Sequence, residues 1–280
     1  MQLSIPPDQI RLVGAFYFRL TSVNLTFFTF SPLIFIYFVL KFLNMVKESI
    51  VISLGGSLVA PGLPAEASAK AGEFIDLGFL KNFKQVLNKY LGKNKFFVLV
   101  GGGKICRVYQ KALLEFGAKE NDRDWMGINI SRLNAEVVKQ MFAGNSYPKV
   151  IIDPNIKIKT NKNIIVGAGY KPGWSTDYVS VLIAKNHNVK TIINLTNVDY
   201  VYYKNPNEFP DAKPLKEVDW KSFQQIVGEK WSPGLSMPFD PRASKLAAKL
   251  KLKVIMINGK KIERLKDFLN GKLFIGTVIN

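Results

Sequence analysis

The chain has 280 residues, of which 48% are hydrophobic and 21% are charged, and its formal net charge is +18 at pH 7. This composition predicts a substantial core in one or two α/β units and excludes extensive disorder. The single cysteine, Cys106, excludes an intramolecular disulfide and a cysteine-based zinc site, which fits a reducing compartment. The single histidine, His187, lies in a polar stretch and is expected at the surface. With only this one histidine, the sequence argues against histidine-dependent catalysis and histidine-ligated metal sites.

The positive charge raises the question of nucleic-acid binding, because clustered lysines and arginines are typical of proteins that bind the phosphate backbone. Here the basic residues are spread along the chain, and even the richest stretch, residues 242–266, reads mainly as solvated helix faces. We therefore do not expect nucleic acid as a main partner. Attraction of small polyanions needs only a local positive field.

Residues 1–44 differ in composition from the rest of the chain. Residues 20–40 carry no charge and are numerous enough to cross a bilayer, although Pro32 interrupts the apolar run. Three interpretations remain open: a leader produced by a start codon placed too far upstream, a genuine membrane anchor, or a cleaved signal. We favour the first, because Met45 opens an ordinary α/β sequence and residues 41–44 offer no small-residue cleavage site.

From Met45 onward the pattern alternates strand and helix, which predicts an open, mainly parallel sheet sandwiched by helices. The expected strands are 49–54, 96–100, 149–152, 164–166, 191–195 and 254–257. The expected helices are 77–91, 104–116, 125–142, a helix capped by Ser175, Thr176 or Asp177 that reaches about Asn186, 216–227, and one that opens at Asp240-Pro241. The 104–116 helix should gather Ile105, Val108, Tyr109, Ala112 and Leu113 on one face.

Glycine-rich corners follow three of the expected strands. The first corner is Gly55-Gly56-Ser57, the second is Gly101-Gly102-Gly103-Lys104, and the third is residues 168–177. Glycine allows backbone and ligand to approach closely, so such corners can direct several N–H groups at one anion. Lys104 and, one helical turn later, Arg107 add positive charge at a helix N-terminus. These features together point to phosphoryl transfer, although neither a P-loop nor a Rossmann fingerprint is present.

The ordered set of motifs resembles the amino acid kinase superfamily and, within it, the archaeal-type uridylate kinases. The resemblance covers Met45 to the end of the chain and preserves order and spacing. The matching residues are the first and second corners with Arg107, Asp124, residues 127–135, Pro172 to Asp177, Thr196 to Asp199 with Val201 and Tyr202, and Asp240-Pro241.

This resemblance implies a single catalytic domain, residues 45–280, that phosphorylates UMP to UDP in pyrimidine nucleotide biosynthesis. ATP would be the phosphoryl donor and would bind together with Mg²⁺. No residue of the chain is assigned as a metal ligand. It also implies a homo-oligomer, a hexamer in many uridylate kinases, and a cytoplasmic location unless residues 1–44 are a real anchor.

The resemblance also assigns expected roles to individual residues. Catalysis would rest on Lys104, Arg107 and Asp177, the last as the superfamily's organising aspartate. ATP would be bound by Gly56, Ser57, Gly103, Arg107, Thr196, Asn197, Tyr202 and Asn205. UMP would be bound by Gly102, Asp124, Tyr170, Lys171, Pro172, Gly173, Trp174, Ser175 and Thr176, with Arg132 and Asn134 as second-rank candidates that could instead line an interface. A simple helix cap is the competing interpretation of Asp177.

Several positions depart from the family pattern. Ser53-Leu54 stands where many superfamily members carry a lysine, although archaeal-type uridylate kinases lack it as well. Tyr200 replaces a glycine, Asn205 replaces an aspartate, and Trp174 stands where histidine is frequent. Two alternatives therefore stay open: an enzyme of the same fold acting on acetylglutamate, glutamate or carbamate, and a non-catalytic nucleotide-binding protein. We assign no chemistry to residues 231–241 beyond a loop and a helix cap.

Overall fold

The part of the chain that carries the predicted motifs is almost fully described. The computed structural model describes residues 47–62, 74–204, 208–209, 211–228 and 237–280. The predicted leader, Asn205 and most of the 231–241 segment lie outside these ranges. Among the described residues, no helix is both long enough and apolar enough to span a bilayer.

A seven-stranded sheet forms the centre of the molecule, with strand order β3-β2-β1-β4-β8-β9-β7. Its strands are β1 (Glu48–Leu54), β2 (Asn94–Val100), β3 (Ile164–Gly167), β4 (Thr191–Thr196), β7 (Glu217–Val218), β8 (Lys253–Asn258) and β9 (Thr277–Ile279). The five strands from β3 to β8 are mutually parallel, and β9 runs antiparallel to β8. A separate pair, β5 (Val201–Tyr202) and β6 (Pro214–Leu215), is antiparallel. The predicted open, mainly parallel sheet is confirmed.

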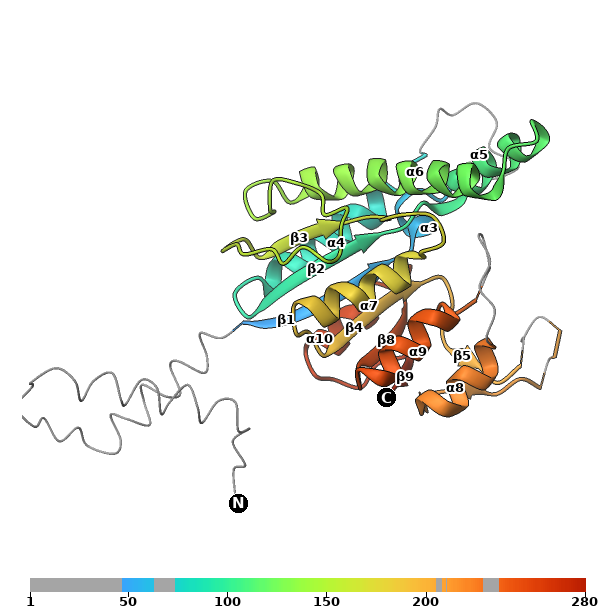
Figure 1. Ribbon diagram of the computed structural model, residues 1–280. Coiled ribbons are helices and arrows are strands. Elements are labelled where there is room, and N and C mark those ends of the chain that lie inside the picture. The colour runs from blue at the N-terminus through green and yellow to red at the C-terminus, as the bar shows by residue number, and fades with distance from the viewer. Residues whose placement is uncertain (1–46, 63–73, 205–207, 210, 229–236) are drawn as a thin grey trace, which may run out of the picture. The chain divides into compact units, whose positions relative to one another are not determined.

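Helices cover both faces of this sheet (Figure 1). The helices are α3 (Gly56–Val59), α4 (Leu77–Tyr90), α5 (Gly103–Glu115), α6 (Glu120–Met141), α7 (Thr176–Asn186), α8 (Trp220–Val227), α9 (Pro241–Lys249) and α10 (Glu263–Leu269). Buried side chains of α4, α6 and α10 pack on one face of the sheet, and those of α7, α8 and α9 pack on the other. The sheet is therefore the middle of three layers.

Strand β1 shows why the sequence forms this sandwich. Ile50, Ile52 and Leu54 belong to the core on one face, and Val51 belongs to the core on the opposite face. Side chains alternate along a strand, so a run of β-branched and apolar residues supplies both faces at once. Burial of these side chains is the main favourable contribution to the stability of the sheet.

Some predicted boundaries are wrong. The expected strand 149–152 is reduced to a single bridge between Ile151 and Gly167, since the chain bends at residues 148 and 149. The expected helix 216–227 begins only at Trp220, where Asp219 caps it; Glu217–Val218 pairs with β9 instead. The short elements α3, α10, β6, β7 and β9 were not predicted, since none carries a full period of apolar residues.

One further boundary is wrong. Helix α6 begins at Glu120 instead of 125, so Asp124 lies inside its first turns.

Two predicted environments also need correction. The expected apolar face of α5 is not a core face: the helix has no buried residue, and Val108 is 67% exposed. His187 is not a plain surface residue, because its ring lies 4.4 Å from the ring of Phe97. Burial lowers the pKa of His187, so its neutral form dominates near pH 7.

Candidate active site

The predicted corners meet at one edge of the sheet. Parallel strands β1, β2, β3, β4 and β8 end on the same side, where ligands bind in open α/β sheets. Backbone hydrogen bonds tie the ends of these strands together. The N–H of Gly101 donates to the carbonyl of Leu54 at 3.0 Å, and the N–H of Gly55 donates to the carbonyl of Leu195 at 3.0 Å. The loop positions at this edge are thus fixed by the sheet itself.

The first and second corners lie in direct backbone contact. A Cβ atom placed on Gly56 would lie 2.2 Å from the nitrogen of Gly103, and one placed on Gly103 would lie 2.5 Å from the carbonyl oxygen of Gly56. Gly103 also has a φ of +75°, a conformation that side chains disfavour. These glycines are therefore required by packing, whatever anion the corners bind.

The cationic side chains of the second corner lie at the start of α5. Gly102 is the N-cap of this helix and provides no side-chain cap, so the first N–H groups of α5 have no partner from a capping side chain. Lys104 and Arg107 are exposed, and within the described residues neither forms a hydrogen bond or ion pair. Unpaired N–H groups and two cations at a helix N-terminus form an arrangement that favours an anion.

The third corner is bound to α6 along its length. Arg132 donates through Nε to the carbonyl of Gly169 at 3.2 Å and through Nη2 to that of Tyr170 at 3.0 Å. Asp124 Oδ2 accepts a 2.7 Å hydrogen bond from the N–H of Gly173. The predicted UMP residues 170–176 and Asp124 are thus brought together, with one Asp124 oxygen occupied by the corner.

Aromatic rings form one wall of the third corner. The ring of Trp174 lies 5.3 Å from that of Tyr170 and 5.0 Å from that of Tyr178, both edge to face. The ammonium of Lys171 lies 4.5 Å from the centre of the Trp174 ring. Such contacts stabilise a cation over an aromatic face and orient the ring. The position often occupied by histidine in the resembled family is here a tryptophan held by its neighbours.

Asp177 lies at the centre of a hydrogen-bond network that joins three elements. Its Oδ1 accepts from Ser53 Oγ of β1 at 2.9 Å, and its Oδ2 accepts from the N–H of Asp240 at 3.3 Å. The helix cap of α7 is Ser175, whose Oγ accepts from the N–H of Tyr178. Of the three cap candidates, the structure selects Ser175, and the interpretation of Asp177 as a simple N-cap is wrong.

The environment of Asp177 changes its acidity. Burial raises the pKa of this carboxyl to about 6, and the nearby Asp240 charge acts in the same direction, while the hydrogen bond from Ser53 opposes both. A buried carboxyl with a raised pKa, held by specific hydrogen bonds beside the glycine corners, is a functional-site candidate, because burial of a charge costs stability and is usually kept only where the group has a function. The group is poised to change charge just below neutral pH.

The predicted adenosine-side residues follow β4. Thr196 ends the strand, and Asn197 contributes its carbonyl to a long, 3.4 Å contact from Asn258 Nδ2. Asp199 pairs with Lys261 and Arg264, each at 2.9 Å. The hydrogen bonds from Arg264 and Lys261 hold the pKa of Asp199 well below its usual range.

The tyrosines of this region pack against each other. The rings of Tyr200 and Tyr202 lie 6.4 Å apart, edge to face. The replacement of the usual glycine by Tyr200 therefore adds an aromatic neighbour to a predicted ATP residue.

Sequence analysis did not identify several residues that shape the site. Ser131 Oγ accepts from the N–H of Gly169 at 2.9 Å, whereas Asn134, already a second-rank candidate, donates through Nδ2 to the carbonyl of Gly101 at 3.0 Å. Asp240 Oδ2 accepts from Ser175 Oγ at 2.5 Å, and Arg242 Nη2 donates to the carbonyl of Gly173. The alternation of β1 could have revealed Ser53, whose side chain must face α7. The others act across long sequence separations that leave no local signal.

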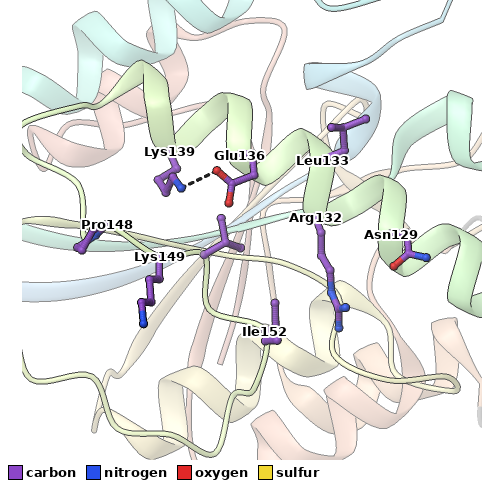
Figure 2. A pocket seen from close by; sticks show the side chains of 9 residues that line it. Asn129, Arg132, Leu133, Glu136, Lys139, Pro148, Lys149 and Ile152 are labelled. Atoms are coloured by element: carbon purple, nitrogen blue, oxygen red, sulfur yellow. Dashed lines mark ion pairs between the residues drawn. The ribbon is translucent and has the colours of Figure 1, made fainter.

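A surface groove of about 630 Å³ lies apart from these corners, between α6 and residues 148–152. Figure 2 shows Leu133, Glu136 and Lys139 on the helix side and Lys149 and Ile152 on the opposite side. Glu136 and Lys139 form an ion pair at 2.5 Å. Arg132 also lines the groove, so α6 connects it to the third corner.

The contact between the first two corners gives a direct test. We expect Gly56→Ala to lower stability by about 1–3 kcal/mol, because the new methyl group meets backbone atoms that cannot yield. Gly92→Ala is the matched control, since a Cβ at Gly92 meets nothing within 4 Å. Thermal unfolding of both variants measures the difference; equal melting temperatures would contradict the packing argument.

Comparisons with known proteins agree with this geometry. The sequence model described as the amino acid kinase family matches residues 48–258. The chain is 33% identical over 226 residues to a uridylate kinase of Pyrococcus abyssi, which covers 80% of this chain and 96% of the relative. It is 33% identical over 236 residues to a uridylate kinase of Methanococcus aeolicus, covering 82% and 99%.

Solved structures give the same result. The crystal structure of uridylate kinase from Archaeoglobus fulgidus superposes with a TM-score of 0.67 at 28% identity, covering 82% of this chain and 99% of that one. UMP kinase from Bacillus anthracis, at 18% identity and a TM-score of 0.65 over 83% of this chain and 96% of that one, shares the fold. The parallel sheet and its glycine corners agree with these matches, and the chain therefore belongs to the amino acid kinase family.

Proposed function

We propose that this protein transfers the γ-phosphoryl group of ATP to UMP, giving UDP and ADP, as a cytoplasmic step of pyrimidine nucleotide biosynthesis. The observation that carries the proposal is the meeting of the corners: the first two touch at Gly56 and Gly103, and the third is bound to Asp124 at the same sheet edge. Relatives named uridylate kinase match over nearly their whole length, which supports the same acceptor.

In this proposal the donor nucleotide lies over the first two corners and the end of β4. Gly56, Ser57, Gly103 and Arg107 contact the ATP phosphates, while Thr196, Asn197 and Tyr202 contact adenosine. Asn205, expected to join them, lies outside the described residues. The acceptor occupies the third corner, with Gly102 and residues 170–176 around UMP and a ribose hydroxyl bound by the oxygen of Asp124 that Gly173 leaves free.

Transfer itself needs alignment and charge stabilisation more than a covalent group. A phosphate oxygen of UMP attacks the γ-phosphorus, the bond to the bridging β,γ-oxygen breaks, and ADP leaves with that oxygen's electrons. Corner N–H groups, Lys104 and Arg107 stabilise the charge that develops on the transferred group. Asp177 orients cationic groups around it from a fixed position between Ser53 and Asp240.

The donor set fits a magnesium ion carried by the nucleotide. Among the described residues there is no cluster of three or more His, Cys, Asp or Glu side chains. Mg²⁺ is commonly bound by phosphates, water and only one or two carboxylates, and Asp177 retains lone pairs for such a role. When bound with the nucleotide, the ion would supply positive charge that offsets the negative charge of the phosphates.

An acceptor screen tests the proposal directly. Protein from Met45 onward, incubated with MgATP, should convert UMP to UDP with release of ADP, measured by anion-exchange chromatography. The full-length chain should be assayed beside it, in membrane and supernatant fractions, to test the leader. An absence of turnover with UMP, CMP and dUMP would refute the proposal.

The pKa of Asp177 gives an expected pH profile. Because the carboxylate form is required, kcat/KM should fall tenfold per pH unit below about 6, and Asp177→Asn should be nearly inactive at every pH. The raised pKa means that the folded protein holds a proton that the unfolded chain releases near pH 4. The stability contribution of this proton is therefore lost as pH rises from about 4 to 6.

The loss of stability between about pH 4 and 6 should be absent from Asp177→Asn. The control variant Asp122→Asn, which changes an exposed carboxylate, should keep it. Melting temperatures and initial rates between pH 4.5 and 8 measure both effects. A wild-type rate profile flat from pH 5 to 8 would show that Asp177 does not need its charge.

The main competing proposal keeps the fold and changes the acceptor to acetylglutamate, glutamate or carbamate. Such acceptors have no ribose, so they do not need the Asp124 carboxylate. If UMP is the acceptor, Asp124→Asn should raise its KM about tenfold or more, because a hydrogen bond to a charged group is lost. An unchanged acceptor KM in this variant favours the alternative.

A non-catalytic nucleotide-binding role is the second alternative. The specific observation in its favour is the packing of Tyr200 on Tyr202, which alters the predicted adenosine site. Tight ATP binding by calorimetry without transfer to any acceptor would support it.

We also propose that the chain forms a homo-oligomer, a hexamer by resemblance to uridylate kinases. The support in this chain is apolar surface on neighbouring helices: Val108 and Leu133 are each 67% exposed, and Phe116 is 86% exposed. Large apolar side chains that stay exposed in a folded protein are candidates for an association surface.

A single charge on this surface tests self-association. Leu133→Asp should reduce the molar mass measured by light scattering, because a carboxylate cannot be buried in an apolar contact without a partner. Leu273→Asp is the control, since Leu273 is fully exposed at 101%. A wild-type monomer at micromolar concentration would refute the proposal.

A further inference from the structure

The tip of the third corner is held from two sides. The N–H of Gly173 donates to Asp124 of α6 at 2.7 Å, and the carbonyl of the same residue accepts from Arg242 of α9. Buried side chains of α6 and α9 belong to opposite faces of the sheet. One glycine therefore connects helices from both outer layers.

Arg242 is itself held in place by its surroundings. It follows the Asp240 cap of α9, and its backbone N–H donates to Asp240 Oδ1 at 2.6 Å. Its guanidinium lies 3.8 Å from Asp240 Oδ2 and 5.7 Å from the centre of the Tyr178 ring. The side chain keeps 40% of its surface exposed, so it is oriented without being removed from solvent. A planar guanidinium loses little entropy per hydrogen bond once it is oriented in this way.

The conformation at Gly173 needs such support. Gly173 has a φ of +79°, and a Cβ built on it would meet nothing within 4 Å. No side chain packs there, so sterics alone do not restrict the glycine to this conformation. The restriction comes from hydrogen bonds at both ends of the residue and from the turn bond between the N–H of Trp174 and the carbonyl of Lys171 at 3.2 Å. A corner that is ordered before its ligand arrives binds more tightly, because less conformational freedom is lost on binding.

We propose that Arg242 is a positioning residue for the acceptor nucleotide: by fixing the carbonyl of Gly173 it keeps the third corner in its binding conformation. This inference rests on the proposed function, with UMP as acceptor. The donor corners are held by different contacts, between Gly56 and Gly103 and between Gly101 and Leu54. Loss of Arg242 therefore acts on the acceptor and leaves the donor nearly unaffected.

Two substitutions and one control test the inference. Arg242→Met keeps a long, unbranched side chain and removes the guanidinium with its donors. Arg242→Lys restores one donor and the charge. Lys249→Met removes an exposed cation from the other end of the same helix. In Arg242→Met we expect the KM for UMP to rise about tenfold with the KM for ATP within about twofold of wild type. Arg242→Lys should recover part of the loss, and Lys249→Met should match wild type.

A second readout needs no substrate. Hydrogen exchange of a peptide covering residues 169–175, measured without nucleotide, should be faster in Arg242→Met than in wild type and unchanged in Lys249→Met. An unchanged UMP KM, an equal rise in both KM values, or unchanged exchange overturns the inference. If wild type fails to phosphorylate UMP, the proposed function fails, and the exchange result still decides whether Arg242 holds the corner.

Discussion

The close approach of two backbone turns is the constraint on which the site depends. Gly56 and Gly103 come so near that neither could carry a Cβ atom, and the sheet hydrogen bonds of the flanking strands leave no freedom to separate them. Parallel strands joined by helical crossovers place all their carboxyl ends at one edge, and small residues at these ends let the turns converge. The same absence of side chains that permits this contact leaves backbone N–H groups open to a ligand. Packing requires these glycines, and the proposed binding of phosphates would use the same residues.

Around that contact, hydrogen bonds between polar side chains fix the positions of the neighbouring strands and helices. Asp177 joins β1, α7 and the start of α9, and Ser175 caps one helix while donating to the cap of another. Burial makes the Asp177 carboxylate unfavourable, as its raised pKa shows. A buried carboxylate that weakens the fold at neutral pH and lies beside the glycine corners is typical of a group retained for function. In the proposed reaction, the contribution of Asp177 to stability and its contribution to chemistry would oppose each other.

Much of this arrangement could be predicted from local sequence. Apolar runs of β-branched residues define β1, β2, β4 and β8, and glycines directly after the first two of them mark the corners. Boundaries failed where capping or tertiary pairing decides, as at the start of α8, which Asp219 caps, and at Glu217–Val218. The contacts of Arg242 and Ser131 could not be predicted, because they join residues far apart in the chain through backbone carbonyls and amides. The exposure of the apolar face of α5 could not be predicted either. The spacing of apolar residues identifies which side of a helix is apolar, but it does not show whether another element covers that side.

The unpartnered cations of the second corner have an energetic consequence. Lys104 and Arg107 remain hydrated and without counter-charges among the described residues, so the protein does not order them in advance. Their attraction extends through solvent only over a screening length of about 8 Å at physiological salt. In the proposed reaction, a polyphosphate that comes within this distance would supply the missing negative charge and order both side chains. Ordering of the positive end of the candidate site would then follow nucleotide binding, whereas the opposite end, where Gly173 is hydrogen-bonded on both sides, is ordered before it.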